Sequence, residues 1–177
     1  PLATGLLLIA VGRKTKTIND LMGMDKVYTG TFKIGATTPS YDLETEVNQI
    51  FPTEHLTETS IRNVPNQFLG EIEQVPPVFS ALKKDGKRLY ELARKGEEVE
   101  VQARKIEILE FEITRIDLPE VDFRVVCSKG TYIRSLAHDF GKALGSGAYL
   151  SALRRTKIGD YNVNNATTPL VFKEELG

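Results

Sequence analysis

The sequence predicts an α+β domain in which a mixed, largely antiparallel sheet carries flanking helices. Three observations lead to this prediction: several segments alternate with the two-residue period of half-buried strands, one long segment has the period of an amphipathic helix, and strands and helices do not alternate strictly. A length of 177 residues fits one domain with its own hydrophobic core. We therefore expect residues 1–177 to form a single domain.

The first 46 residues are expected to contain two strands, a short helix and a loop. The apolar run Leu6–Val11 predicts a buried strand that ends at Gly12, and a short helix is expected near Thr17–Met22. Apolar and polar side chains alternate over Tyr28–Ile34, which predicts a half-buried strand. Residues 36–46 are polar and rich in turn-forming residues, so they predict a loop.

The middle of the chain carries helix and turn signals. The segment Thr57–Phe68 predicts a helix that Pro65 interrupts near its end, because proline cannot donate a helical hydrogen bond. Residues 84–87 predict a turn. A short helix is expected over Arg88–Lys95, ended by Gly96.

The last third carries the clearest periodic patterns. Apolar residues from 106 to 113 predict a long strand whose alternation slips near Leu109, as at a β-bulge. Residues 121–127 alternate without interruption and predict a second strand. The segment Tyr132–Leu144 has apolar residues at helical spacing and predicts an amphipathic helix, followed by an extended, basic segment over Tyr149–Ile158.

Composition excludes several classes of protein. The single cysteine, Cys127, excludes a disulfide framework and favours a reducing compartment. The two histidines and this cysteine lie far apart in the sequence, which disfavours a zinc site. No apolar run approaches the ~18 residues that span a bilayer. We therefore expect no metal site, no membrane-spanning segment and a cytoplasmic location.

Charge is unevenly distributed although the net charge is only −1. Residues 41–75 carry seven acidic side chains and one arginine, whereas residues 82–105 carry eight Lys or Arg and five acidic side chains. Further basic clusters lie at Arg13–Lys16 and Arg154–Lys157. From charge alone, solvated surface charge is the favoured interpretation, and a polyanion held on one face is the alternative.

Five segments carry motifs that follow one another along nearly the whole chain: PLATGLL at 1–7, KVY at 26–28, the region from QVPPVFSA at 74–81 to ARKG at 93–96, KGTYIRSLA at 129–137, and GAYL…LRRT at 147–156. Together and in this order they resemble the motifs of TruB-type tRNA pseudouridine synthases. One departure is Phe79, where the family often has tyrosine. The resemblance implies the pseudouridine synthase fold.

The resemblance also implies an activity. The family isomerises a uridine in the T loop of tRNA to pseudouridine, using no cofactor, metal or external energy source. Its essential aspartate would lie directly before Pro1, outside the chain as given, together with a histidine further upstream that helps to turn out the target nucleotide. We therefore expect an N-terminally incomplete catalytic domain that is inactive alone. Attack of the aspartate on the sugar and attack on the base both remain open.

Residues around this aspartate are implied by the same resemblance. Tyr28 would stack on the uracil and offer its hydroxyl for proton transfer, while Arg134 would pair with the aspartate and keep it ionised. Tyr132 and Leu153 would complete the base pocket, and Lys26 would lie near it. From the residues alone, Tyr28, Tyr132 and Leu153 also fit core packing, and Lys26 also fits a solvent-facing lysine. For Arg134, a cation at a helix N-terminus is unfavourable, which favours a specific role.

The implied partner is the T stem-loop of tRNA, bound by a monomer. Phosphate contacts, which position RNA without recognising its sequence, would come from basic residues of two regions: Lys83, Lys87, Arg88, Arg94, Arg154 and Arg155. The segment Val78–Gly96 would form a mobile RNA-gripping region.

Two alternatives differ in the class of function. One is a non-catalytic RNA-binding module on the same scaffold, with strongly salt-dependent binding and no product. The other is the guide-RNA-dependent archaeal and eukaryotic branch of the same family, which the absence of a PUA-type extension and of a long basic tail disfavours.

Overall fold

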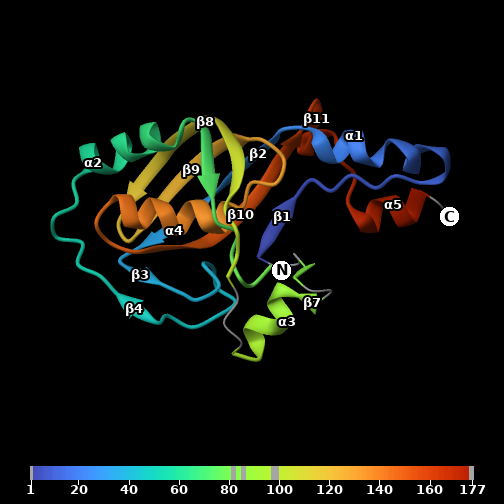
Figure 1. Cartoon of the computed structure of the whole chain (residues 1–177). Helices are drawn as coiled ribbons and strands as arrows, with labels where there is room; N and C mark the ends of the chain where they lie inside the picture. The colour runs from blue at the N-terminus through green and yellow to red at the C-terminus, as the bar shows by residue number, and fades with distance from the viewer. Residues whose placement is uncertain (1, 81–82, 85–86, 97–99, 176–177) are drawn as a thin grey trace.

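A seven-stranded sheet lies at the centre of the molecule, and helices flank it (Figure 1). The computed structural model describes residues 2–80, 83–84, 87–96 and 100–175, with the backbone alone given at 83–84, 87–88, 93 and 175. The strand order is β1 (Ala3–Gly5), β10 (Ala148–Ile158), β2 (Lys26–Ile34), β9 (Glu120–Cys127), β8 (Arg104–Asp117) and β5 (Gly70–Gln74), and β11 (Tyr161–Asn162) pairs with β10.

Strand directions agree with the predicted fold class. Strand β1 runs parallel to β10, and the other pairs of this sheet are antiparallel. The mixed, largely antiparallel α+β architecture is therefore confirmed. Two small antiparallel pairs lie outside the large sheet: β3 (Ala36–Thr37) with β4 (Gln49–Ile50), and β6 (Lys83–Lys84) with β7 (Lys87–Arg88).

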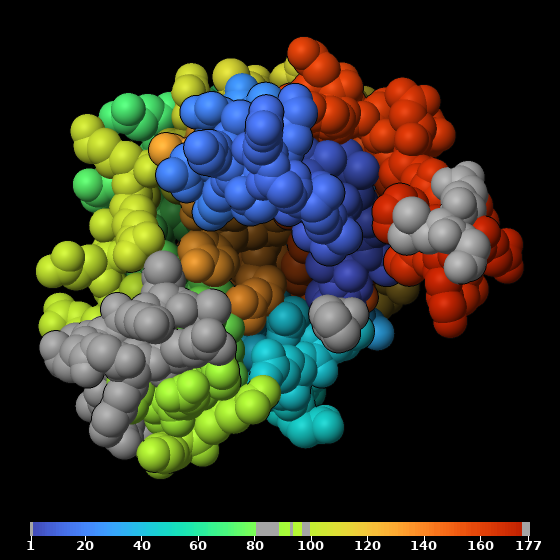
Figure 2. All heavy atoms as spheres, turned by 90° about the vertical axis from the view of Figure 1, so that its right-hand side faces the viewer, coloured from blue at the N-terminus to red at the C-terminus, as the bar shows by residue number. Residues whose placement is uncertain are grey.

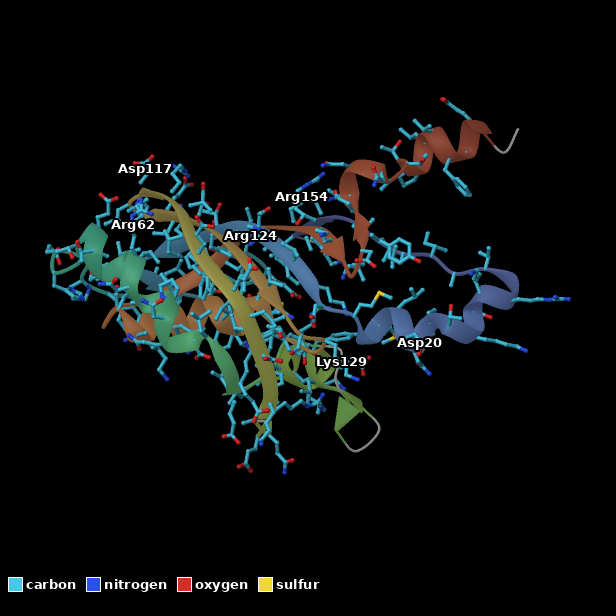
Figure 3. All side chains as sticks on the ribbon, turned by 90° about the horizontal axis from the view of Figure 1, so that it is seen from above. Asp20, Arg62, Asp117, Arg124, Lys129 and Arg154 are labelled. Atoms are coloured by element: carbon cyan, nitrogen blue, oxygen red, sulfur yellow. The ribbon has the colours of Figure 1, made fainter. Side chains whose placement is uncertain are left out.

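The helices lie at different places around the sheet. Helix α4 (Ile133–Ala143) crosses one sheet face, whereas α1 (Ile18–Gly23) and α5 (Pro169–Glu175) both lie beyond one end of the sheet (Figure 1), apart from each other in the view from above (Figure 3). Figure 3 shows this elongation from above, with Asp20 of α1 at one end and Arg62 and Asp117 at the other. The remaining helical segments are η1 (Gly12–Thr17), α2 (Glu58–Asn63), η2 (Val64–Phe68), α3 (Leu89–Arg94) and η3 (Val163–Asn165).

The core forms where α4 packs against the sheet. Phe32, Phe123 and Phe140 are fully buried, and the Phe32 ring centroid lies 4.1 Å from that of Phe123 and 5.1 Å from that of Phe140. Helix α4 comes close to β10 because residue 141 is glycine: a Cβ there would lie 2.2 Å from the backbone nitrogen of Ala148. Burial of each aromatic side chain stabilises the fold by about 1.5–3 kcal/mol. This packing fixes the start of α4 relative to β10.

Most element predictions are confirmed. Strand β2 covers the predicted alternating segment, and β8 has a register shift between Ile108 and Glu110, where the slip near Leu109 predicts a bulge. Helix α2 begins after a Thr57 capping box and gives way to η2 at Val64–Pro65, as the proline predicts. The predicted turn at 84–87 joins β6 to β7, and its residues 85–86 lie outside the described part of the chain.

The prediction of a buried strand over Leu6–Val11 is wrong. Strand β1 ends at Gly5, and Leu6 makes the last backbone contact, donating its N–H to the Arg155 carbonyl at 2.8 Å. Leu6 is buried, but Leu7, Ile9 and Val11 are 69%, 79% and 73% exposed. The apolar composition of this segment predicted that it would be buried as a strand. Among the described residues, however, no strand pairs with the segment beyond Leu6.

The single cysteine leads to a chemical prediction. Cys127 is fully buried at the end of β9, and burial raises the pKa of its thiol to about 11. The native thiol should therefore resist alkylation by iodoacetamide at pH 8, whereas the unfolded chain should react quickly. Because the folded-state pKa is raised above the ordinary value of 9.0, the stability that burial contributes is present below about pH 9 and is lost towards about pH 11. Fast labelling of folded protein would contradict this.

Candidate active site

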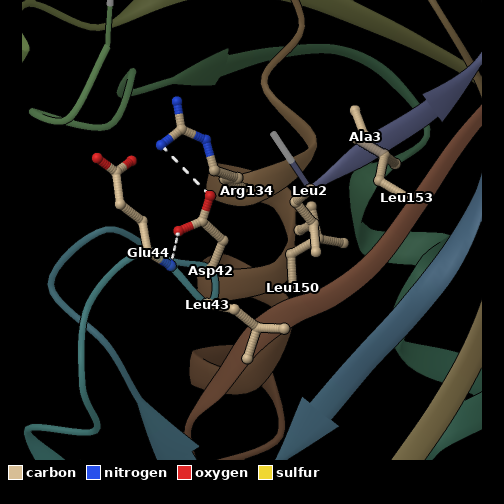
Figure 4. A pocket seen from close by; sticks show the side chains of 8 residues that line it. All are labelled: Leu2, Ala3, Asp42, Leu43, Glu44, Arg134, Leu150 and Leu153. Atoms are coloured by element: carbon tan, nitrogen blue, oxygen red, sulfur yellow. Dashed lines mark hydrogen bonds and ion pairs between the residues drawn. The ribbon is translucent and has the colours of Figure 1, made fainter.

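A cavity of about 600 Å³ opens where the first strand, the loop after β3, the start of α4 and strand β10 meet (Figure 4). Its lining residues come from these four places: Leu2 and Ala3; Asp42, Leu43 and Glu44; Arg134; and Leu150 and Leu153. Figure 2 shows the molecule hollowed between the N-terminal segment and the region around α3, with residues of the α4–β10 region at the bottom. One cation and two carboxylates thus share a mostly apolar cavity.

Arg134 and Asp42 face each other across this cavity. The Arg134 Nη1 lies 3.7 Å from Asp42 Oδ2 (Figure 4). It also donates a hydrogen bond to the Ser40 carbonyl at 3.3 Å. Only 21% of the Arg134 side chain and 11% of the Asp42 side chain are exposed. The carboxylate compensates a cation that the positive end of the α4 dipole would otherwise disfavour. The pair leaves a fixed guanidinium available to the cavity.

A tightly bonded loop holds Asp42 in place. The Asp42 carbonyl accepts a hydrogen bond from Thr38 Oγ1 at 2.7 Å, and its Oδ1 accepts one from the Glu44 N–H at 2.9 Å. Tyr41 has a φ of +64°, a left-handed conformation that costs about 1–2 kcal/mol for a residue with a Cβ. Its carbonyl accepts a hydrogen bond from the Leu150 N–H at 2.9 Å, which ties the loop to β10.

The start of α4 is fixed by a buried glutamine. Gln74 Oε1 accepts a hydrogen bond from the Tyr132 N–H at 2.8 Å, and Gln74 Nε2 donates one to the Tyr132 carbonyl at 3.1 Å. Ser135 Oγ donates to the Val75 carbonyl at 2.6 Å. These contacts anchor the first turn of α4 to the end of β5, so Arg134 has a defined position.

Tyr28 and Arg155 are opposite neighbours on β2 and β10. Burial raises the pKa of the Tyr28 hydroxyl, and a hydrogen bond with Arg155 partly offsets this rise. The hydroxyl is therefore protonated at neutral pH and can donate a proton. Arg155 Nε also donates to the Leu6 carbonyl at 2.8 Å, which joins Tyr28 to the end of β1.

Strand β1 reaches this site through a close backbone contact. Ala3 lies opposite Leu153 in the parallel pairing of β1 with β10. At Gly5, with a φ of +97°, a Cβ would lie 2.2 Å from the Arg155 carbonyl oxygen, so glycine is required there. The motif PLATGLL therefore has a structural reason for its glycine, and it brings Leu2 and Ala3 to the cavity wall.

The chain matches two models of known protein families. A model described as "TruB family pseudouridylate synthase (N terminal domain)" matches residues 1–133, more than half of the sequence. The chain belongs to the TruB family. A second model, "tRNA pseudouridylate synthase B C-terminal domain", matches residues 134–174. In the structure this part contributes α4 and β10, which pack within the same core and sheet as the preceding residues.

Curated relatives of this TruB-family chain have the same name. The protein called tRNA pseudouridine synthase B in Flavobacterium johnsoniae is 68% identical over 176 residues, which are 99% of this chain and 77% of the relative. The protein of that name in Parabacteroides distasonis is 53% identical over 169 residues, covering 96% of this chain and 72% of the relative.

Solved structures with a similar fold come from Cbf5 complexes. A chain in "Crystal Structure of a Cbf5-Nop10-Gar1 Complex" matches with a TM-score of 0.66 and 29% identity, over 90% of this chain and 38% of that one. A chain in "Crystal structure of the archaeal box H/ACA sRNP Nop10-Cbf5 complex" matches with a TM-score of 0.61 and 28% identity, over 90% and 36%. The TruB-family chain thus spans little more than a third of the length of these chains. The similarity of fold confirms the predicted pseudouridine synthase fold.

The structure brings only part of the TruB-like residue set into the cavity lining. Arg134 and Leu153 line it together. Tyr132 contributes main-chain contacts at the start of α4, and Tyr28 packs against the core on β2. Lys26 instead donates to the carbonyls of Met22 and Met24 at the end of α1 and borders a separate cavity of about 320 Å³. This placement favours a structural role for Lys26.

Basic residues predicted to contact RNA have different surroundings. Arg94 forms an ion pair with Glu44 at 2.7 Å, beside the cavity. Arg154 is exposed, whereas the next residue, Arg155, points to the opposite sheet face and is engaged by Leu6 and Tyr28. The side chains of the other three predicted residues, Lys83, Lys87 and Arg88, lie outside the described part of the structure.

Sequence reasoning missed Asp42 and Glu44. Both lie in the segment predicted only as a polar loop, and no periodic pattern marks them. The sequence also does not indicate that this loop is buried, because its buried residues Thr38, Ser40 and Asp42 are polar. Hydrogen bonds within the loop hold them there. Within the residues that the structure describes, no group of three His, Cys, Asp or Glu side chains lies close enough to hold a metal, and no helix has the length and apolarity to cross a membrane.

Proposed function

We propose that this TruB-family protein converts a uridine in the T loop of tRNA to pseudouridine. The observation that carries the proposal is the cavity in which Arg134, braced by Asp42, lies beside Leu2 and Ala3 of the PLATGLL motif. The names of the curated relatives support tRNA as the substrate. Because tRNA is the proposed substrate, we expect the protein to act in the cytoplasm. We further propose that it acts as a monomer.

The proposed reaction is an isomerisation whose atoms balance without an external reagent. The bond between uracil N1 and ribose C1′ breaks, the uracil turns, and a bond forms between its C5 and C1′. The proton on C5 leaves and N1 gains one. The target nucleotide must first leave its stack, at a cost of a few kcal/mol. An apolar cavity with few polar groups is suited to accept a flat base.

We propose that the acting acid is the aspartate which the family motif has directly before Pro1. Leu2 and Ala3 line the cavity with Arg134, which supports a carboxylate two positions before Leu2 entering the same space. A neighbouring guanidinium lowers the pKa of a carboxylic acid and holds it ionised. Asp42 and Glu44 are then further carboxylates of the site, and the role of Asp42 is to hold Arg134. Attack on the sugar and attack on the base both fit this arrangement.

RNA would lie across the hollow face. We propose that Arg94 and Arg154, whose side chains are exposed, contact RNA phosphates. We propose the same role for Lys83, Lys87 and Arg88. Such contacts release counterions, so the affinity should fall steeply with salt. Arg155 is a weaker candidate because its side chain already bonds to Leu6 and Tyr28.

Tyr28 is expected to act through its hydroxyl as well as its ring. Changing Tyr28 to Phe removes a partly buried, protonated hydroxyl, so kcat should fall by about 10²-fold, within the usual range for a lost proton-transfer group. The Kd for RNA should stay within about twofold, since the ring remains. Tyr161→Phe, at an exposed tyrosine on β11, is the matched control and should change neither quantity. Equal losses of kcat and affinity in Tyr28→Phe would assign Tyr28 to structure alone.

Product analysis tests the proposed function. The full-length protein is incubated with a T-arm stem-loop RNA, and the nucleosides are separated chromatographically, because uridine and pseudouridine have equal mass. We expect pseudouridine at one T-loop position and none in an RNA with cytidine there. Salt-dependent binding with no pseudouridine would instead support a non-catalytic RNA-binding module.

A further inference from the structure

We propose that the stacked side chains of Tyr41 and His138 are positioning residues for the reaction, because they hold the loop that presents Asp42 to Arg134. This inference rests on the proposed function and adds two residues that the family motifs above do not include. Neither residue lines the cavity, so both act through Asp42.

The backbone at Tyr41 needs an external constraint. Tyr41 is the one non-glycine residue with a positive φ among those that the structure describes, at +64°. Such conformations persist only when surrounding contacts determine them. Three contacts do so here: the Tyr41 N–H donates to the Thr38 carbonyl at 3.1 Å, its carbonyl accepts from the Leu150 N–H at 2.9 Å, and its ring stacks on His138. The first two fix the chain, and the third fixes the side chain.

The stacking geometry is close and nearly parallel. The ring centroids of Tyr41 and His138 lie 4.1 Å apart, with 15° between the ring planes. Asp42 follows Tyr41 directly, so the direction of its side chain depends on the backbone that this stack supports. A loop free to leave the left-handed conformation at residue 41 would turn the Asp42 carboxylate away from the cavity.

Helix α4 holds three consecutive loop residues through two successive turns. Arg134 and His138 are four residues apart, so they lie on the same helix face. Arg134 contacts the Ser40 carbonyl and the Asp42 carboxylate, and His138 stacks on Tyr41 between them in sequence. The contacts from helix α4 therefore fix both the position and the orientation of this loop relative to the helix. This arrangement lets one rigid element position both members of the Arg134–Asp42 pair.

The imidazole is suited to stacking rather than to proton transfer. Its Nδ1 is buried and has no hydrogen-bond partner among the described residues. Burial and the nearby Lys142 lower the pKa of His138, and burial together with Asp139 raises the pKa of the Tyr41 hydroxyl. Both rings are therefore neutral near pH 7. A phenyl ring in place of the imidazole would keep the stack and remove the unpaired buried nitrogen.

Four variants of the full-length protein test this role. We expect His138→Ala to lower kcat on a T-arm stem-loop about tenfold, with the Kd for RNA unchanged within about twofold, whereas His138→Phe should retain the parental kcat. Tyr41→Gly should lower kcat to a similar extent, although glycine accepts a positive φ, because the ring is lost. Tyr41→Phe should retain activity. Thermal unfolding of each variant ensures that kcat is measured on folded protein.

The outcomes separate this role from others. A parental kcat in both His138→Ala and Tyr41→Gly would overturn the proposal, and so would an equal loss in His138→Ala and His138→Phe, which would assign chemistry to the ring nitrogens. If His138→Ala does not fold, Tyr41→Gly decides alone, since it leaves α4 intact. Absence of product from the parental protein would reject the proposed function instead. In an Asp42→Asn background, His138→Ala should cause little further loss of kcat. Both changes weaken the same interaction, the ion pair between Arg134 and Asp42, so their effects should not add.

Discussion

Replacing Arg134 by methionine is expected to lower kcat by about 10²- to 10³-fold, the range found when one fixed charged or hydrogen-bonding group is removed from an active site. Arg134 is the cation that lines the cavity described here, and Asp42 and Ser40 hold its guanidinium. Methionine fills a similar volume but carries no charge. The Kd for RNA should change by less than about fivefold, because phosphate contacts elsewhere dominate the affinity.

Two controls separate charge from geometry. Arg134→Lys keeps the charge but loses the planar fork that contacts Ser40 and Asp42, so it should recover only part of the lost activity. Arg124→Met removes a partly exposed arginine of strand β9, away from the cavity lining, which pairs with Glu110 at 2.6 Å and is labelled in Figure 3, and it should leave kcat unchanged. Retained activity in Arg134→Met, measured with the same RNA, would remove Arg134 from the reaction.

Much of the fold could be predicted because burial in this protein follows periodic patterns. In β9 the residues Val121, Phe123, Val125 and Cys127 alternate in sequence and are all at most 1% exposed. The bulge in β8 could be located because a single extra residue shifts which side chains face the core. Helix α4 was also predictable, since its apolar face packs on the sheet.

The segment Leu6–Val11 shows where apolar composition is insufficient. A strand needs a neighbour to satisfy its backbone groups, and pairing cannot be deduced from one segment. In the structure β10 accompanies the chain only as far as Leu6, and three of the next five residues expose large apolar side chains.

The candidate site was only partly accessible to sequence reasoning. Arg134 and Leu153 came from motifs and lie together in the cavity. Asp42 was missed because its position depends on a left-handed residue and on loop hydrogen bonds, neither of which has a pattern along the chain. Lys26 was placed near the site by its motif, whereas its ammonium group caps α1 instead. Motifs thus identified candidate residues, and the structure showed which of them line the same cavity.

The largest effect is expected from the proposed aspartate directly before Pro1. Changing it to asparagine removes the ionised carboxylate that we propose takes part in the reaction, while it preserves the size of the side chain. Loss of a group that reacts covalently leaves little residual catalysis, about 10⁴-fold or more below the parent. Folding and RNA affinity should be retained, because the cavity wall of Leu2, Ala3 and Arg134 is unchanged.

Tritium release measures this most directly, because forming the bond between C5 and C1′ expels the hydrogen on C5. The T-arm stem-loop is prepared with uridine tritiated at C5 and mixed with full-length protein or with the Asp→Asn variant. We predict release of one tritium per RNA with the parental protein, and no release by the variant at equal RNA binding. Tritium release by the variant at the parental rate would contradict the account.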